Sequence, residues 1–259
     1  MAYYKKNAIL LLSMAMSDKR ILEEVEKGDI IINPFNQKNL NTSSYDVTLG
    51  EYYYRSDNWR PEGRIYNIYN EKETKEFWGH LVKADIPSKT WKGAASLGIS
   101  ENDKVIVIQP GETILAHTQE FIGGKGHITT MMKARSSMGR QMIAVCKCAG
   151  WGDVGYINRW TLEITNYSKY APIPLVVGRR IAQIVFFETG PILKDDYAKE
   201  GKYQETDILA DVMKSWKPED MLPKLWKDRD IKHTANHDNP MSYCEHGLHH
   251  RACPKCNVL

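Results

Sequence analysis

The sequence predicts a mostly β fold, a distorted barrel or jelly roll with a short N-terminal helix and a C-terminal extension. Two observations carry this prediction. Short runs of β-branched and other apolar residues recur between residues 105 and 187, and turn-forming Gly and Pro residues separate them. The chain has 259 residues, 42% of them hydrophobic, which is enough for one sizeable domain with appendages.

A short helix is expected first. Ser17 is a residue type that caps helix N-termini, and Gly28 is the type that ends helices. Between them, apolar residues recur at helical spacing at Ile21, Leu22 and Val25. The segments then expected as strands, in order, are residues 30–32, 43–50 after a polar turn, 105–108, 114–116, 160–165 and 181–187.

Changes in composition divide the chain. We predict an N-terminal extension over residues 1–16, a main domain over residues 17–206 and a C-terminal extension over residues 207–259. An aromatic-rich, irregular stretch from about residue 55 to 100 is expected to be an insertion in the main domain.

Two polar stretches follow the last strand. Residues 195–207 are expected to be a polar tail-like segment. Residues 207–226 predict one or two short helices, which Pro218 and Pro223 interrupt.

Charge and cysteine content narrow the function classes. The net charge of +3 is small and dispersed, so no nucleic-acid partner is expected. No apolar run reaches the roughly 18 residues of a membrane span. The N-terminus superficially resembles a signal peptide, but charged residues follow at once. The five cysteines form two clusters without a disulfide pattern, so we expect reduced thiols and a cytoplasmic protein.

Three segments with chemical uses fall in a fixed order. The first holds two guanidiniums, Arg135 and Arg140, around the hydroxyls of Ser136 and Ser137. Arginine is permanently charged and binds phosphate oxygens in pairs, so this cluster suits a polyphosphate. The alternative is a polar loop with a helix cap.

The second segment, residues 149–156, is a Gly-rich turn with the carboxylate of Asp153 and the ring of Tyr156. The alternative is a turn-forming Asp beside a core Tyr. The third, residues 161–166, places Glu163 among apolar and β-branched residues, where an unpaired carboxylate is costly. Its pKa should therefore be raised, unless Glu163 simply faces outward on a half-exposed strand.

Together these segments resemble the dCTP deaminase branch of the trimeric dUTPase-like family. The short helix, Asn33-Pro34-Phe35 and the Ser-Ser-Tyr-Asp-Val-Thr-Leu-Gly run at 43–50 extend the resemblance over roughly residues 17–204. It implies a dUTPase-like distorted barrel and a homotrimer with active sites at subunit interfaces. It also implies Mg²⁺ bound with a triphosphate.

The resemblance implies hydrolytic deamination of dCTP, or a related deoxycytidine nucleotide, to dUTP and ammonia. Glu163 would act as general base and acid, activating water for attack at C4 and passing protons to N3 and the leaving ammonia. Arg140 and Ser136 would assist the catalytic water. The implied nucleotide-binding residues are Arg135, Ser136, Ser137, Arg140, Ala149, Asp153, Tyr156, Thr161, Lys202 and Tyr203.

The sequence departs from the family pattern in two places. The usual Ile-Asp-Pro-Gly is Gly152-Asp153-Val154-Gly155 here, which keeps the carboxylate but loses the proline. Lys202 and Tyr203 match a motif that closes over the phosphates, but the Gln that often follows the Tyr by three residues is Thr206. A flexible polar tail is the alternative for this segment.

Three other functions stay open. A bifunctional deaminase that also releases pyrophosphate is compatible with Asp153, whereas a plain dUTPase has no use for the Glu163 base. The alternative from another class is a catalytically silent nucleotide-sensing module, with the C-terminal extension as its partner-binding arm.

The C-terminal residues 244–256 carry a metal-ligand pattern outside the family resemblance. The two-residue gap between Cys253 and Cys256 lets both thiolates bind one zinc ion. Cys244 and one of His246, His249 or His250 would complete a tetrahedron, with His246 or His249 preferred. This zinc would be structural; the alternative is a His/Cys-rich tail without metal. The other two cysteines, Cys146 and Cys148, are expected to alternate along a strand and face one side as packed side chains, and the alternative is a redox or metal pair.

Overall fold

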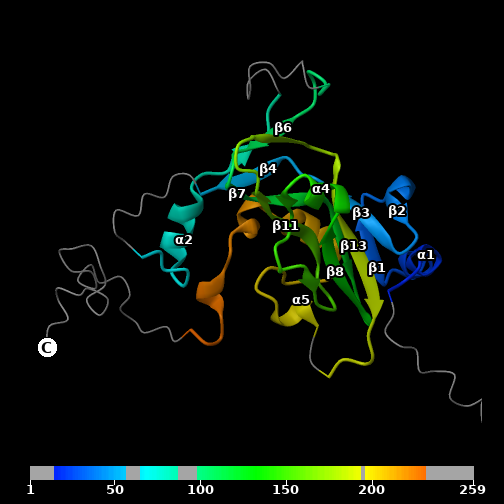
Figure 1. Cartoon of the computed structure of the whole chain (residues 1–259). Coiled ribbons are helices and arrows are strands. Elements are labelled where there is room, and N and C mark those ends of the chain that lie inside the picture. The colour runs from blue at the N-terminus through cyan, green and yellow to red at the C-terminus, as the bar shows by residue number, and fades with distance from the viewer. Residues whose placement is uncertain (1–14, 57–64, 87–97, 194–195, 232–259) are drawn as a thin grey trace, which may run out of the picture. The chain divides into compact units, whose positions relative to one another are not determined.

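The computed structural model describes residues 15–56, 65–86, 98–193 and 196–231 (Figure 1). It divides into two compact units. One comprises residues 1–53 and 81–221, and the other comprises residues 54–80 and 222–259. Every predicted nucleotide-binding residue lies in the first unit.

The first unit is built from antiparallel sheets, and the prediction of a mostly β fold is confirmed. The larger sheet has the order β5-β4-β7-β11-β9, and β1 also pairs with β7. Its strands are β1 (Ile30–Asn33), β4 (Tyr52–Arg55), β5 (Val82–Lys83), β7 (Thr113–Gly124), β9 (Ile143–Ala144) and β11 (Ile157–Asn166).

The second sheet has the order β10-β8-β13-β3-β2, and Figure 1 shows β8 and β13 side by side. Its strands are β2 (Leu40–Asn41), β3 (Ser44–Thr48), β8 (Ile128–Ala134), β10 (Trp151–Gly152) and β13 (Arg180–Glu188). A two-stranded sheet joins β6 (Val105–Ile108) to β12 (Ile173–Val176). A 3₁₀ turn, η1 (Gln37–Asn39), precedes β2.

One hydrophobic core is shared by the two larger sheets. Leu162 and Ile164 of β11 are fully buried in it, as are Tyr45 of β3 and Phe186 of β13. Successive side chains of a strand point to opposite faces. The face of β11 that carries Leu162 and Ile164 therefore faces the core, and Glu163 lies on the other face.

The predicted N-terminal helix is confirmed as α1 (Asp18–Lys27). The Ser17 hydroxyl accepts a hydrogen bond from the Arg20 backbone N–H, which satisfies a donor at the helix start. Gly28 ends the helix in the left-handed region, at φ 82°. Both ends are thus fixed by local chemistry.

The expectation of a tail-like segment over residues 195–207 is wrong. The chain forms a short helix there, α5 (Tyr197–Glu200), and the Gln204 side chain is buried. Its amide exchanges hydrogen bonds with the main chain at residues 155–157, so long-range pairing orders a segment that is polar in sequence. The helices expected farther on are confirmed as α6 (Leu209–Ser215) and the 3₁₀ turn η3 (Pro218–Met221).

The expectation that Cys146 and Cys148 face one side of a strand is also wrong. Strand β9 ends at Ala144, and the chain bends through residues 145–148 with a φ of 38° at Lys147. A positive φ breaks the period of two on which the expectation rested. Cys146 is buried and Cys148 is exposed.

The second unit contains the helix α2 (Glu71–Trp78) and the 3₁₀ turn η4 (Leu225–Lys227). Asn70 caps α2 by accepting a hydrogen bond from the Glu73 N–H, and the ring of Tyr66 stacks on Phe77 at 4.3 Å. In the part of the chain that the structure describes, no helix is long and apolar enough to cross a membrane.

Candidate active site

Glu163 lies in the middle of β11, opposite Leu115 of β7. Its side chain is half-buried, and its Oε2 atom is buried without a hydrogen-bond partner among the described residues. Burial raises the pKa of this carboxyl to about 7, although a backbone hydrogen bond and the nearby Lys147 ammonium oppose the shift. At neutral pH the group is therefore poised to take or give a proton.

The bend after β9 brings two side chains, Cys146 and Lys147, towards Glu163. The Lys147 charge lowers the pKa of the Glu163 carboxyl. Burial is the main cause that raises the pKa of the Cys146 thiol, and the Glu163 charge raises it further. Lys147 Nζ also lies 3.5 Å from the Thr113 hydroxyl on β7. No role for Lys147 was predicted from the sequence, where the one signal was its place two residues before the Gly-rich turn.

A cavity of about 450 Å³ opens along this bend. It is lined by residues 131–134 of β8, by residues 144–148, and by Gly150 and Trp151. The exposed ring of Trp151 stacks on Phe187 at 6.4 Å. Ala149 is exposed on the same bend.

The segment that carries Arg135, Ser136, Ser137 and Arg140 forms the single-turn helix α4 (Ser136–Arg140) directly after β8. Ser136, Ser137 and Arg140 are exposed, so their donors are available to a ligand. Among the described residues, no hydrogen bond or ion pair joins any of them to Glu163. Within one chain, the predicted phosphate-binding residues and the predicted base therefore lie on different elements, α4 and β11.

Arg135 is held by a buried carboxylate that the sequence did not single out. Asp46 on β3 is 3% exposed, and its Oδ2 lies 3.5 Å from Arg135 Nε and 2.9 Å from Arg180 Nη1. Arg135 Nη1 also donates to the Arg180 carbonyl at 3.2 Å. Asp46 thus orients the Arg135 guanidinium.

The Gly-rich turn lines a second cavity, of about 600 Å³. Asp153 is exposed there, and Asp196, Tyr197 and Lys202 line the same cavity. Gly155 has a φ of 91°, and a Cβ atom at this position would lie 2.9 Å from the Asp196 side chain. Glycine is therefore required where the turn meets the later segment.

Hydrogen bonds join this turn to the segment around Lys202 and Tyr203, which the family resemblance predicts to close over the phosphates. Gln204 Nε2 donates to the Gly155 carbonyl at 2.8 Å, and its Oε1 accepts from the Ile157 N–H at 2.8 Å. Asn158 Nδ2 donates to the Tyr203 carbonyl at 3.2 Å. The structure thus places Lys202 on the same cavity as Asp153 and joins Tyr203 to Asn158, and the alternative of a flexible tail does not describe this segment.

Tyr156 packs in an aromatic cluster. Its ring meets Trp160 edge-on at 5.2 Å and Tyr197 edge-on at 5.1 Å, and burial raises the pKa of its hydroxyl well above the usual range. These contacts favour the alternative of a packed ring. Thr161 is half-buried two residues before Glu163, so both side chains lie on the same face of β11.

The predicted zinc ligands Cys244, His246, His249, Cys253 and Cys256 lie outside the described residues.

The chain is similar to known proteins over most of its length. A family model described as dCTP deaminase-like matches residues 15–189. A protein of Hydrogenobaculum sp. (strain Y04AAS1), named dCTP deaminase, dUMP-forming, is 33% identical over 173 residues, covering 67% of this chain and 81% of its own length. A Nanoarchaeum equitans (strain Kin4-M) protein of the same name is 31% identical, covering 73% of this chain and 92% of its own length.

Among solved structures, a crystal structure of 2'-deoxycytidine 5'-triphosphate deaminase from Agrobacterium tumefaciens aligns with a TM-score of 0.47 and 18% identity. That alignment covers 70% of this chain and 50% of the other.

Proposed function

The chain belongs to the dCTP deaminase-like family, and from that membership we propose that it converts dCTP and two water molecules into dUMP, ammonia and pyrophosphate. From the family resemblance, dUTP was the product first expected. The names of the relatives, dUMP-forming, are at odds with dUTP as the end product and agree with the bifunctional alternative. Asp153 is then the carboxylate assigned to the second hydrolysis.

The observation that carries the deaminase proposal is the Glu163 carboxylate, with a buried, unpaired Oε2 and a pKa of about 7. In the proposed reaction, Glu163 takes a proton from the water that attacks C4 of cytosine. It passes protons to N3 and to the amino group, which leaves as ammonia. A group with a pKa close to the working pH does both most efficiently.

Polar side chains of α4 and of the cavity of about 600 Å³ supply the nucleotide contacts in this proposal. Arg135, Ser136 and Ser137 bind phosphate oxygens, and Lys202, which lines that cavity with Asp153, supplies a further cation for them. Mg²⁺ accompanies the triphosphate, for which the Asp153 and Asp196 carboxylates on one cavity are suitable oxygen donors.

We further propose a homotrimer in which neighbouring chains complete each site. The exposed donors of α4 and the unpaired Glu163 oxygen lie on separate elements of one chain. Large apolar side chains are also exposed nearby: Met142 is 57% exposed and Tyr167 is 61% exposed, and a 2.8 Å backbone hydrogen bond joins these two residues. Adjacent exposed apolar side chains are typical of interfaces.

Product analysis tests the proposed activity. Purified protein with dCTP and Mg²⁺ should release ammonia, dUMP and pyrophosphate in equal amounts, measured by chromatography and an ammonia assay. Ammonia with dUTP as the only nucleotide product would leave a deaminase without the second step. Hydrolysis of dUTP without ammonia from dCTP would mean a plain dUTPase, and nucleotide binding without turnover would mean a sensing module.

A further inference from the structure

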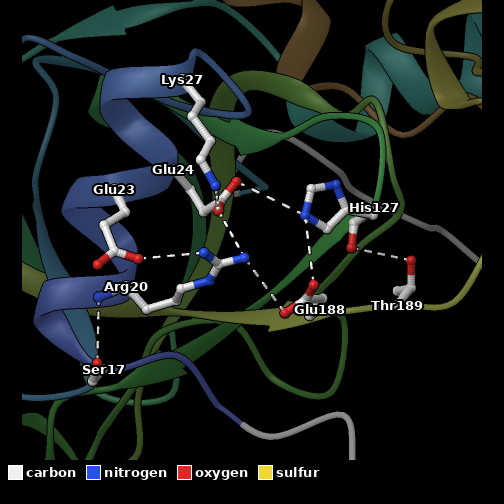
Figure 2. A network of polar contacts seen from close by, with 8 residues as sticks. All are labelled: Ser17, Arg20, Glu23, Glu24, Lys27, His127, Glu188 and Thr189. Atoms are coloured by element: carbon white, nitrogen blue, oxygen red, sulfur yellow. Dashed lines mark hydrogen bonds and ion pairs between the residues drawn. The ribbon is translucent and has the colours of Figure 1, made fainter. Parts of the chain in front are cut away.

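A network of charged side chains surrounds Glu24 of α1, and it contains none of the predicted site residues (Figure 2). Glu24 is 0% exposed. Its Oε1 atom accepts from Lys27 Nζ and from Arg20 Nη2, both at 2.8 Å. Its Oε2 atom is buried and has no hydrogen-bond partner among the described residues. Half of a buried carboxylate is thus left unsatisfied, which is costly unless something binds there.

The unsatisfied oxygen faces a histidine. Figure 2 shows the His127 ring between Glu24 and Glu188, and Nε2 lies 3.8 Å from Glu24 Oε2 and 3.8 Å from Glu188 Oε1. These distances exceed the 2.7–3.2 Å of a hydrogen bond. Asp29 completes the group, since one ligand atom each from Glu24, Asp29 and His127 lies within 4.8 Å of the others.

From this arrangement we infer that Glu24, Asp29 and His127 form a binding site for a divalent transition-metal ion such as zinc. Two ligands bound to one zinc ion lie about 3.4 Å apart at the tetrahedral angle and at most about 4.2 Å apart. The 3.8 Å between Glu24 Oε2 and His127 Nε2 is within this range. Imidazole with carboxylates is a donor set that suits zinc better than calcium or magnesium.

The backbone around the three ligands is already ordered. The Asp29 N–H donates to the Glu24 carbonyl at 3.0 Å, and the Lys125 N–H donates to the Asp29 carbonyl at 2.8 Å. The His127 carbonyl accepts from the Thr189 N–H at 2.7 Å. Binding therefore needs only side-chain adjustment.

The local charge also permits a cation. Three carboxylates, those of Glu24, Asp29 and Glu188, surround the site, and two cationic side chains, Arg20 and Lys27, oppose them. Both cations approach Glu24 through Oε1 and leave Oε2 to the proposed ion. The ion would tie α1 to the β7–β8 turn, a structural role independent of the proposed catalysis.

The test uses the full chain with Cys244, Cys253 and Cys256 all changed to Ser, so that the predicted tail site cannot bind. Calorimetric titration with Zn²⁺ should show one ion per chain. The His127→Gln variant in this background should bind at least about 10-fold more weakly, because it loses one of three ligands. The control Glu23→Gln changes a carboxylate of the same helix that pairs with Arg20 but lies outside the group, and it should bind normally.

A thermal melt supplies a second readout. Zinc at about 100 times its dissociation constant should raise the Tm of the triple-Ser background by about 5–10 °C, and the Tm of His127→Gln much less. Since the His127 side chain is 36% exposed, this variant should keep its fold, which its circular dichroism without metal will show. Absence of zinc binding in the background, or equal binding by His127→Gln, would overturn the proposal.

Discussion

Burial among apolar neighbours is the main cause of the raised pKa of the Glu163 carboxyl. Leu162 and Ile164 beside it are fully buried. Because an unpaired carboxylate is costly among apolar residues, a raised Glu163 pKa was predicted from the sequence. The structure confirms the direction of the shift. The effect of Lys147 on Glu163 was not predictable, because it depends on the bend after β9, where Lys147 has a positive φ.

Replacing Glu163 with Gln should lower kcat for deamination by at least about 10²-fold, because the amide keeps the shape but cannot accept the water proton. Binding of dCTP should change little. Ammonia release and calorimetry on the purified variant measure the two effects. Glu101→Gln, an exposed carboxylate elsewhere in the first unit, is the matched control. Near-normal turnover by Glu163→Gln would exclude it as the base.

The pH dependence should report the ionisation of Glu163. A general base acts when deprotonated, so kcat/KM should fall as the pH drops below about 7 and level off above it. The Lys147 ammonium lowers the Glu163 pKa, so Lys147→Gln should move this limb to higher pH. Lys169→Gln removes an exposed charge elsewhere and should leave the limb in place. An unshifted limb in Lys147→Gln would contradict the proposed tuning.

Arg135 and Arg140 should affect catalysis by different routes. Asp46 fixes the Arg135 guanidinium, which suits phosphate binding, so Arg135→Ala should lose more affinity for dCTP than for dCMP. Arg140→Ala should mainly reduce kcat, because we assign it to the water and Glu163. Titrating both variants with both nucleotides separates the routes. Equal losses of affinity for dCTP and dCMP in Arg135→Ala would refute its assignment.

At the level of elements, what is local in sequence was predictable. The caps of α1 and the alternating burial of β11 depend on residues within a few positions of one another. The ordered conformation around Gln204 was not predictable, because its side chain bonds to residues 155–157, nearly fifty positions earlier. The clamp of Asp46 on Arg135 was missed for the same reason.

The C-terminal extension should hold one structural zinc ion through Cys244, Cys253, Cys256 and one of His246 or His249. We therefore expect deletion of residues 233–259 to remove one zinc ion per chain while deamination continues, since the metal has no open position for water. Elemental analysis and the ammonia assay give the two results. Cys148→Ser alters an exposed thiol outside the extension and should keep its zinc. Equal zinc content in the deletion variant and the full chain would show that the extension is not a zinc site.

At the level of the whole molecule, the candidate residues fall into two groups. Asp153 and Lys202 line one cavity, and hydrogen bonds hold the segments that carry them together. The α4 donors form a separate group that makes no described contact with Glu163. The sequence predicted the members of both groups but could not show this division, because it depends on how the sheets are arranged.

A mixture of two inactive variants should reveal whether neighbouring chains complete one site. Arg140→Ala keeps Glu163, and Glu163→Gln keeps Arg140, so neither variant alone forms a complete site. If each site takes Glu163 from one chain and Arg140 from its neighbour, random co-assembly at equal amounts should restore about a quarter of the sites. Ammonia release from co-expressed protein measures the recovery, and the two proteins mixed without reassembly are the control. Sites built within one chain would stay inactive in every mixture, because each chain then carries its own defect.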